Sequence, residues 1–290
     1  MTTPARTIAY SGEPGAFAED AVISAFGPAA ARMPVGGFRE VFEAVAGGRA
    51  GAGVVPIENL ANGSIRETYD LLLEHQLVID AEVTVPVELC LAALPGTRLE
   101  GIQRVYSHIQ ALGQAERYLR AGGWQLLTTY NTAGAGRFVL AQGDHAAGAV
   151  LSRRAAEVLG LDVLASSIQD VPDNRTRFLV LATEAGGSGL GAATNRSDDA
   201  GWRTTIAFGV RNEPGTLLAS LQVFAGRGIN LSKLESRPSR SADWEYVFWA
   251  DLDTSAADPT AAAALDDLRA VATMVRVFGT YRRSAETTRG

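Results

Sequence analysis

Short apolar segments alternate with helical patterns throughout residues 7–183, and this alternation constrains the fold more than any other feature. The segments expected as strands are 7–10, 53–57, 104–106, 125–129, 147–151 and 179–182. Helical spacing is found at 16–26, 38–46, 110–121, 132–142 and 153–159. Strands that alternate with helices are typical of mainly parallel sheets covered on both faces. We therefore expect an α/β fold.

Residues 63–94 refine this expectation. Ser64 and Glu67 fit the Ser-x-x-Glu capping box, which predicts a helix that starts just after Gly63. Three apolar segments, 77–83, 85–87 and 89–94, then follow one another closely. We expect them to form strands that cross between two lobes.

The composition changes at residue 185, where Gly, Ser, Asn and Asp dominate as far as residue 201. Such a stretch is typical of a flexible linker, so we place a domain boundary there. The preceding domain is then 1–184, and a second domain, 202–283, has the pattern strand–helix–strand–strand–helix–strand. This βαββαβ order is the ferredoxin-like arrangement. Residues 284–290 are expected to be a polar tail.

Charge and cysteine usage exclude several classes of protein. The net charge is −6 and there is no block of basic residues, which argues against nucleic acid as a partner. No apolar run approaches the roughly 20 residues that span a bilayer, and residues 1–7 lack a signal-peptide pattern. Cys90 is the only cysteine and has apolar neighbours, so we expect a buried core residue and a reducing, cytoplasmic location.

Common catalytic motifs are absent from the sequence. Gly12-x-x-Gly15 lacks the third glycine of a dinucleotide fingerprint, and no Walker phosphate loop or Gly-x-Ser-x-Gly elbow is present. The three histidines, His75, His108 and His145, have no metal-ligand spacing. The sequence therefore disfavours a nicotinamide, nucleotide, zinc or serine-hydrolase site.

Small polar residues instead recur where an expected strand ends and a helix begins. These turns are Gly12–Gly15, Glu58-Asn59, Ser107-His108, Asn131-Thr132 and Ser152. Unpaired backbone N–H groups at helix starts attract carboxylate or phosphate, so several such turns around one cleft would bind a small dianion. The alternative is that they only cap helices, which is the stronger interpretation for Thr132 and Ser152.

A second polar stretch, residues 168–178, precedes the apolar strand 179–182. Thr176 offers a hydroxyl donor, and Arg175 and Arg177 offer permanent positive charge beside it. This combination suits an anionic substrate whose leaving oxygen needs a hydrogen bond. The alternative is a turn with solvated arginines at the entry to a strand.

Taken together and in order, these motifs resemble the prephenate dehydratase family with its regulatory ACT domain. The motifs are Gly12-Glu13-Pro14-Gly15-Ala16-Phe17, Val55-Pro56-Ile57-Glu58-Asn59 with Gly63-Ser64, Ser107-His108-x-Gln110 with Gln114, Thr132-Ala133, and Asn174-Arg175-Thr176-Arg177-Phe178. In the second domain they are Gly215-Thr216-Leu217-Leu218 and Gly228–Pro238. The resemblance covers nearly the whole chain.

The resemblance implies a two-lobed catalytic domain, similar to periplasmic binding proteins, that converts prephenate to phenylpyruvate in phenylalanine biosynthesis. Thr176 would donate to the leaving oxygen, and Glu58, if burial raises its pKa, is one candidate for the proton source. Asn59, Ser107 and Gln114 would orient the substrate. Further substrate contacts would come from Arg177, Gly15, Ala16, Phe17, Thr132 and Asn174. No metal or organic cofactor is implied.

Each of these roles has a structural alternative. Arg177 would bind the pyruvyl carboxylate or only support the site, Glu58 could cap a helix, and Gln114 could be solvated. His108 is expected to be structural and Phe178 to lie in the core. Two positions depart from the family pattern, which has Ser or Thr at Leu60 and Pro at Ile109. The intact Thr176-Arg177-Phe178 triplet argues against related decarboxylases.

For the second domain the resemblance implies an allosteric phenylalanine site near an interface between chains, in a homodimer or homotetramer. Its residues would be Gly215, Thr216, Leu217, Leu218, Asn230, Leu231, Glu235, Ser236, Arg237 and Pro238. The alternative is a dimer contact without a ligand. For the whole chain, arogenate dehydratase and a non-catalytic sensor of small anions stay open as alternatives.

Overall fold

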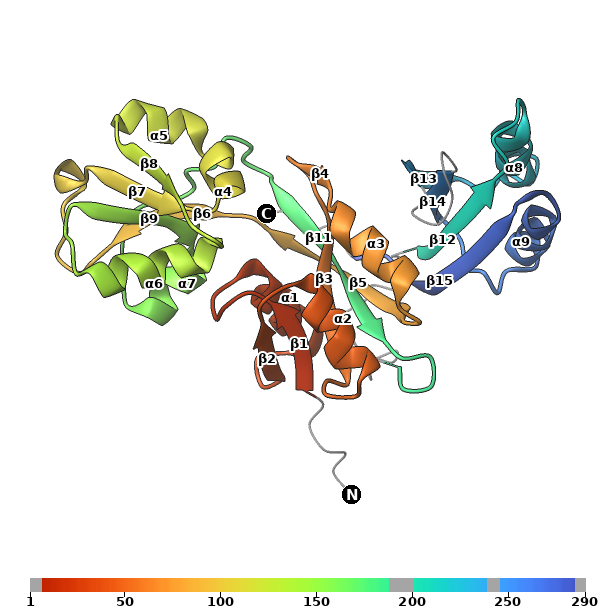
Figure 1. The fold of residues 1–290 in the computed structure, drawn as a ribbon, viewed down its shortest axis with the longest axis horizontal. Coiled ribbons are helices and arrows are strands. Elements are labelled where there is room, and N and C mark those ends of the chain that lie inside the picture. Colours follow the sequence, from red (N-terminus) through yellow and green to blue (C-terminus); the bar gives the residue numbers. More distant parts are fainter. Residues whose placement is uncertain (1–6, 188–200, 239–245, 285–290) are drawn as a thin grey trace, which may run out of the picture. The chain divides into compact units, whose positions relative to one another are not determined.

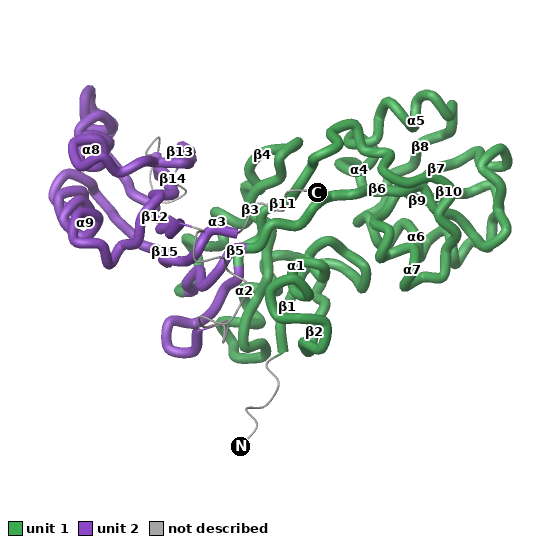
Figure 2. Tube along the Cα trace, turned by 180° about the vertical axis from the view of Figure 1, so that it is seen from behind, with its two compact units in different colours: residues 1–76, 83–179 green, residues 77–82, 180–290 purple. Residues whose placement is uncertain are grey.

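The computed structural model describes residues 7–187, 201–238 and 246–284, which form three β-sheets with helices (Figure 1). Most of the predicted linker and tail therefore lies outside the described residues. The division into two compact units differs from the predicted domain boundary. The first unit is Met1–Gln76 with Val83–Leu179, and the second is Leu77–Glu82 with Val180–Gly290 (Figure 2).

The first sheet has the strand order β2-β1-β3-β11-β5, with the short β4 paired to β3. Its strands are β1 (Thr7–Ser11), β2 (Ala31–Val35), β3 (Ala52–Asn59), β4 (Gly63–Ser64), β5 (Val78–Pro86) and β11 (Arg175–Ala182). The helices α1 (Phe17–Phe26), α2 (Phe38–Ala46) and α3 (Arg66–Glu74) connect or follow these strands. β1 is parallel to both β2 and β3, as the alternating pattern predicted. β5 and β11 each run from one compact unit into the other.

The second sheet has the order β10-β6-β9-β7-β8. Its strands are β6 (Leu89–Ala93), β7 (Arg104–Ser107), β8 (Gln125–Thr128), β9 (Ala147–Ser152) and β10 (Asp162–Ala165). Its helices are η1 (Leu99–Gly101), α4 (Ile109–Gln114), α5 (Glu116–Gly122), α6 (Thr132–Gln142) and α7 (Arg153–Leu159). β7 is parallel to β8 and β9, whereas β6 is antiparallel to β9 and β10, so this sheet is mixed.

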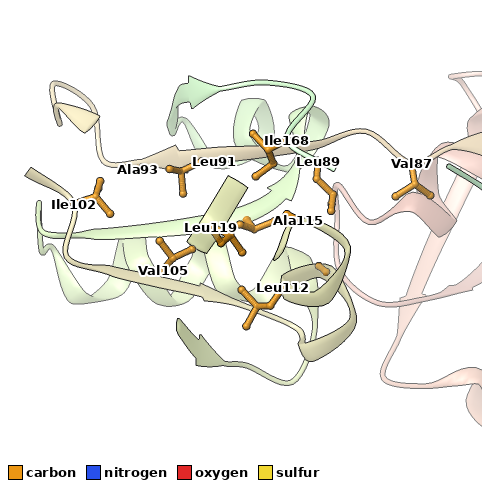
Figure 3. Close-up of a cluster of buried hydrophobic side chains, with 12 residues drawn as sticks. Val87, Leu89, Leu91, Ala93, Ile102, Val105, Leu112, Ala115, Leu119 and Ile168 are labelled. Carbon is orange, nitrogen blue, oxygen red and sulfur yellow. The ribbon is translucent and has the colours of Figure 1, made fainter. Parts of the chain in front are cut away.

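Alternate residues of these strands form the core of the second sheet (Figure 3). Leu89 and Leu91 of β6 and Val105 of β7 are fully buried, and Leu112 and Leu119 pack on them from the neighbouring helices. Side chains two apart on a strand share a face, which is why the apolar pattern places them together. The three apolar segments expected as crossing strands form two strands: 77–83 and 85–87 are one strand, β5, of the first sheet, and 89–94 gives β6 of the second, so the chain does pass between the lobes here.

The third sheet, with order β13-β14-β12-β15, confirms the βαββαβ domain. Its elements are β12 (Trp202–Val210), α8 (Thr216–Ala225), β13 (Leu231–Pro238), β14 (Tyr246–Leu252), α9 (Pro259–Val271) and β15 (Met274–Arg282). All its strand pairs are antiparallel. The two-domain α/β architecture predicted from the sequence is thus correct.

Three local predictions are wrong. The helix expected at 110–121 is divided at Ala115 into α4 and α5. Ser64 does not cap α3: the N-cap is Ile65, without a side-chain cap, because the backbone of Gly63 and Ser64 pairs with β3. The strand expected at 179–182 begins at Arg175, where the Leu60 N–H donates to the Arg175 carbonyl at 2.9 Å.

Candidate active site

Two adjoining cavities lie within the first compact unit, with volumes of about 430 and 650 Å³. We call them the small and the large cavity. Both are lined by Ser11, Phe17, Phe38, Glu67, His108 and Thr132. We call the first sheet with α1–α3 one lobe and the second sheet with α4–α7 the other. The shared lining residues come from both lobes, since they lie in or next to β1, α1, α2 and α3 on one side and α4 and α6 on the other. The volumes are in the range that holds a small organic acid.

The end of β3 meets the start of β11 at the wall of the large cavity. Asn59 and Thr176 both line this cavity, and both are buried. The Asn59 Nδ2 amide donates to Thr176 Oγ1 at 2.9 Å and to the Arg175 carbonyl at 3.2 Å. Because the threonine oxygen accepts this bond, its own O–H proton is left to donate elsewhere.

The backbone around Asn59 fixes the direction of that bond. Asn59 Oδ1 accepts from the N–H groups of Ala61 at 3.1 Å and Asn62 at 3.0 Å, and Gln114 Nε2 lies 3.5 Å away. Since backbone N–H groups can only donate, the oxygen of the Asn59 amide must face them and the nitrogen must face Thr176. The site therefore presents an oriented neutral hydroxyl, which suits a hydrogen bond to a leaving oxygen.

Three helix starts line the small cavity. Ala16 and Gly37 are the N-caps of α1 and α2 and have no side-chain cap, while Asn131 caps α6 with Oδ1 on the Gly134 N–H at 2.5 Å. Uncapped N–H groups and the helix dipoles favour a carboxylate at this position. Thus the predicted anion-binding turns 12–15 and 131–132 do face a common cavity.

Gly15 is required at this wall for steric reasons. Its φ is +89°, and a Cβ there would lie 2.5 Å from the Ala155 Cα. The Ser152 hydroxyl donates to the Gly15 carbonyl at 2.7 Å and also accepts from the Ala155 N–H. Ser152 thus caps α7, as the alternative interpretation held, and links the two lobes at the same time.

Several predicted site residues lie outside both linings. Ser107 is fully buried, and its hydroxyl donates to the Val150 carbonyl at 2.6 Å. Asn174 is buried, and its Oδ1 accepts from the Ala61 N–H at 3.3 Å, so it supports the turn that holds Asn59. Glu58 and Arg177 pair with each other, with Oε2 and Nη2 3.7 Å apart. Since β11 alternates, Thr176 and Phe178 face the cavity and Arg177 does not.

The cavities also contain residues that sequence reasoning passed over. Arg66 lines the large cavity and Tyr130 the small one, and Glu67, assigned to a helix cap, lines both. His108 is the N-cap of α4, with Nδ1 accepting from the Gln110 N–H at 3.4 Å, yet it also lines both cavities. The turn Ser107-His108 was among the strand ends expected at a cleft, although the histidine itself was expected to be structural.

Polar contacts between the two lobes lie at Tyr130, which lines the small cavity. Glu13 accepts from the Tyr130 hydroxyl, which raises the pKa of Tyr130, and pairs with Arg137 Nε at 3.1 Å. On α1, burial raises the pKa of Asp20 to about 6 although Arg154, with Nε 3.4 Å from Asp20 Oδ1, opposes the shift. Burial also raises the pKa of Cys90 to about 11, which confirms the prediction of an inert core residue.

In the βαββαβ domain, the residues of the predicted effector site lie on two segments. Gly215, with φ +89°, precedes α8, and Thr216 Oγ1 donates to the Arg211 carbonyl at 2.7 Å. Leu218 is 60% exposed, whereas Leu217 packs on the domain core. The other segment is β13, at the edge of the sheet, where half-buried and exposed residues alternate.

The partners of this second segment are polar. Asn230 Nδ2 donates to Asp253 Oδ2 at 2.6 Å. Glu235 pairs with Lys233 at 3.5 Å and with Arg237 at 3.9 Å, while Leu231 contributes to the core and Ser236 and Pro238 are exposed. Whether these residues bind phenylalanine stays a prediction.

Neither a metal cluster nor a membrane span is found in the described part of the chain. No group of three His, Cys, Asp or Glu side chains in residues 7–187, 201–238 and 246–284 could hold a metal ion. No helix within these ranges is long and apolar enough to cross a membrane.

Two family models match the chain. Residues 8–186 match prephenate dehydratase and residues 204–270 match the ACT domain. Among curated proteins, arogenate dehydratase/prephenate dehydratase 1 of Arabidopsis thaliana, a chloroplastic protein, is 41% identical over 288 residues, covering 94% of this chain and 71% of its own.

Two solved structures are similar over almost the whole chain. The prephenate dehydratase of Arthrobacter aurescens in complex with L-Phe has a TM-score of 0.86 and 31% identity, covering 98% of this chain and 92% of its own. GqqA, described as a novel type of quorum quenching acylase, has a TM-score of 0.85 and 31% identity, covering 97% of this chain and 99% of its own.

Proposed function

Because the chain belongs to the prephenate dehydratase family of lyases and carries an ACT domain, we propose that it converts prephenate to phenylpyruvate in phenylalanine biosynthesis. The observation that carries this proposal is the oriented Thr176 hydroxyl at the wall of the large cavity. The cavity volume and the helix starts are consistent with a small dicarboxylic acid.

The reaction needs one hydrogen-bond donor at a defined place. The bond between the ring and its carboxylate breaks to release CO2, its electrons complete the aromatic ring, and the bond to the ring hydroxyl breaks. Hydroxide leaves and takes up one proton to become water. Thr176 donates to the departing oxygen, where charge develops in the transition state. No metal or organic cofactor is needed for these steps.

Neutral groups around the ring carboxylate fit the same chemistry. Strong stabilisation of that carboxylate would oppose its loss, and Asn59 and Gln114 carry no charge. The pyruvyl carboxylate is then held at the helix starts of the small cavity, with Arg66 as a cation beside the large cavity. Arg177, paired with Glu58, supports β11 from the other side in this proposal.

The proton comes from His108 in this proposal. Glu58, the candidate named from the sequence, is paired with Arg177 and lines neither cavity. His108 lines both; when its ring is protonated, Nε2 carries a proton that it can donate, and Nδ1 gives up the 3.4 Å bond from the Gln110 N–H, which only the neutral ring accepts. Histidine can deliver a proton near neutral pH, which a threonine hydroxyl cannot do.

Regulation by phenylalanine is proposed for the ACT domain, as feedback by the end product. The support is the ACT match and the L-Phe bound to the related Arthrobacter structure. In this proposal two chains pair near β13 in a homodimer or homotetramer, and the enzyme is cytoplasmic. Phenylalanine that changes neither the rate nor the oligomeric state would contradict the regulatory part.

A direct assay separates the candidate functions. Purified protein is mixed with prephenate, and the formation of phenylpyruvate is followed; arogenate, with phenylalanine as its product, is tested in parallel. We expect turnover of prephenate, at least a tenfold loss in Thr176→Val, and little loss in the exposed control Thr128→Val. Binding of prephenate without turnover by folded protein would favour a sensor. Because one neighbour is described as an acylase, an N-acylated amino compound completes the panel.

A further inference from the structure

Within the second compact unit, residues 77–82 lie along the last strand of the βαββαβ domain. Arg276 Nη2 of β15 donates to the Leu77 carbonyl at 3.3 Å, and Ser284 N donates to Glu82 Oε1 at 2.8 Å. Between these contacts Gly279 approaches Ile79. We call this line of contacts the β5–β15 seam. It joins β5 to the third sheet at three successive points.

The middle of the seam admits only glycine. A Cβ on Gly279 would lie 2.0 Å from the Ile79 carbonyl oxygen and 2.9 Å from its carbon. These are backbone atoms, so a side chain at this position would have to push the two strands apart. The seam is therefore a close backbone packing rather than a loose contact of side chains.

A buried ion pair fixes the end of the seam. Arg203 Nη1 of β12 lies 2.6 Å from Glu82 Oε2, and the side chains of Arg203 and Glu82 are only 9% and 3% exposed. Arg203 Nε also lies 3.8 Å from Asp251 Oδ2 of β14. Such a buried pair costs desolvation, so it is weak evidence for stability and better evidence for a defined arrangement.

The network continues into the core of the same domain. Asp251 Oδ1 accepts from the Thr205 hydroxyl at 2.7 Å, and Thr205 Oγ1 lies 2.6 Å from the Tyr281 hydroxyl. Thus Glu82 is connected to three strands of the third sheet, β12, β14 and β15. A change in that sheet would therefore change the contacts of the Glu82 carboxylate with Arg203 and Ser284.

From Glu82 the chain leads to the candidate active site. β5 ends at Pro86, and the next residue, Val87, lines the large cavity together with Leu89. The Val87 N–H donates to the Asn174 carbonyl at 2.8 Å, two residues before Thr176. β5 also lies beside β11, the strand of Thr176 (Figure 1).

We propose that the Glu82–Arg203 pair couples ligand binding in the ACT domain to the large cavity through β5, with Arg203 as a positioning residue. This inference rests on the proposed function, which supplies the two ligands. The alternative is that the pair only anchors β5 to the domain. Coupling requires an element whose arrangement both sites influence. β5 leads into Val87 at the wall of the large cavity, and its residue Glu82 contacts the third sheet of the ACT domain.

The test uses the full chain with the double substitution Glu82→Gln and Arg203→Met. The introduced glutamine can still accept the Ser284 N–H through its amide oxygen. The introduced methionine fills the volume of the arginine stem, so both charges of the pair are removed together. The control is Asp266→Asn with Arg269→Met, an exposed pair at 2.6 Å on α9 of the same domain. Prephenate turnover, phenylalanine binding by calorimetry, and inhibition are measured for each.

We call the double substitution Glu82→Gln with Arg203→Met the seam variant. We expect its rate of prephenate turnover without phenylalanine, and its dissociation constant for phenylalanine, to stay within about threefold of those of the unaltered chain. Its inhibition midpoint should rise at least tenfold, whereas the control should change in none of these. Equal inhibition midpoints in the variant and the unaltered chain would overturn the coupling role. A variant that loses phenylalanine binding and inhibition together would overturn it too, because the pair would then only maintain the ACT domain.

A second readout keeps the coupling separate from the proposed catalysis. Hydrogen exchange in residues 83–89 is compared with and without phenylalanine. We expect phenylalanine to change exchange in the unaltered chain and the control but not in the seam variant. If prephenate is not turned over, the proposed function fails while this comparison still decides the coupling. Absence of phenylalanine binding in the unaltered chain would overturn both the coupling and the proposed phenylalanine regulation, while leaving the proposed catalysis standing.

Discussion

The substitution Asn59→Asp tests the catalytic geometry most sharply. Aspartate keeps the oxygen that accepts from the N–H groups of Ala61 and Asn62, at 3.1 and 3.0 Å. It replaces the Nδ2 donor to Thr176 Oγ1 by an acceptor. The Thr176 hydroxyl must then donate to the introduced carboxylate and can no longer donate to the leaving oxygen. The polarity of one hydrogen bond is reversed with almost no change in shape.

The magnitude follows from the bonds that change. Loss of one oriented donor to a transition-state oxygen lowers kcat by about 100- to 1000-fold, or roughly 3–4 kcal/mol. Asn59 also loses its partly buried bond to the Arg175 carbonyl at 3.2 Å, and that carbonyl still accepts from the Leu60 N–H, so the free energy of unfolding should fall by about 0.5–1.5 kcal/mol. Initial rates of phenylpyruvate formation and urea unfolding measure the two effects separately.

A double-mutant cycle with Thr176→Val decides whether the effect passes through Thr176. Each single variant should lose about 100- to 1000-fold, and the double variant should lose no more than about threefold beyond Thr176→Val. Losses that multiply in the double variant would refute the proposed route.

Three further outcomes are expected. His108→Asn, which retains a capping oxygen for α4, should lower kcat at least tenfold with KM nearly unchanged; a kcat within about threefold of the unaltered chain would return His108 to a structural role. Asp20 has a folded-state pKa raised from 3.8 to about 6, so its protonated form stabilises the fold at low pH, and this contribution is lost as the pH rises from about 4 to 6. Asp20→Asn should remove that pH dependence and raise the free energy of unfolding at pH 7 by about 1–3 kcal/mol, measured by urea titration. An unchanged pH dependence would contradict the assignment. Gly279→Ala should lower the thermal midpoint and weaken phenylalanine inhibition together, whereas Gly201→Ala, where a Cβ meets its nearest atom at 4.0 Å, should do neither.

Local patterns were sufficient to predict most elements of the fold. α2 and α7 begin and end at the predicted residues, because apolar spacing and terminal glycines mark both ends. β2 and β10 were missed, and both consist of residues that are partly or fully exposed. An edge strand is defined by its partner's backbone, and the sequence of the strand itself carries little signal of that pairing.

The candidate site shows the same division between local and tertiary information. Gly12–Gly15 and Asn131-Thr132 were found from turn chemistry, which is local, and both line the small cavity. Glu67 was assigned to a cap that the pairing of β4 with β3 removes. Its place at the cavity follows from where α3 packs, which depends on residues far away in the sequence.

The sequence could not determine which side chains of β11 point into the cavity. Thr176 and Arg177 are neighbours, so a shift of one residue in register would put the arginine in the cavity and the hydroxyl behind the sheet. Two bonds to the Arg175 carbonyl, from the Leu60 N–H and from Asn59 Nδ2, hold the register. Asn59 therefore both sets the strand that presents Thr176 and orients its hydroxyl. Because the same amide group of Asn59 performs both roles, a substitution that removes one role also removes the other. We therefore expect no second-site change on β11 alone to rescue Asn59→Asp.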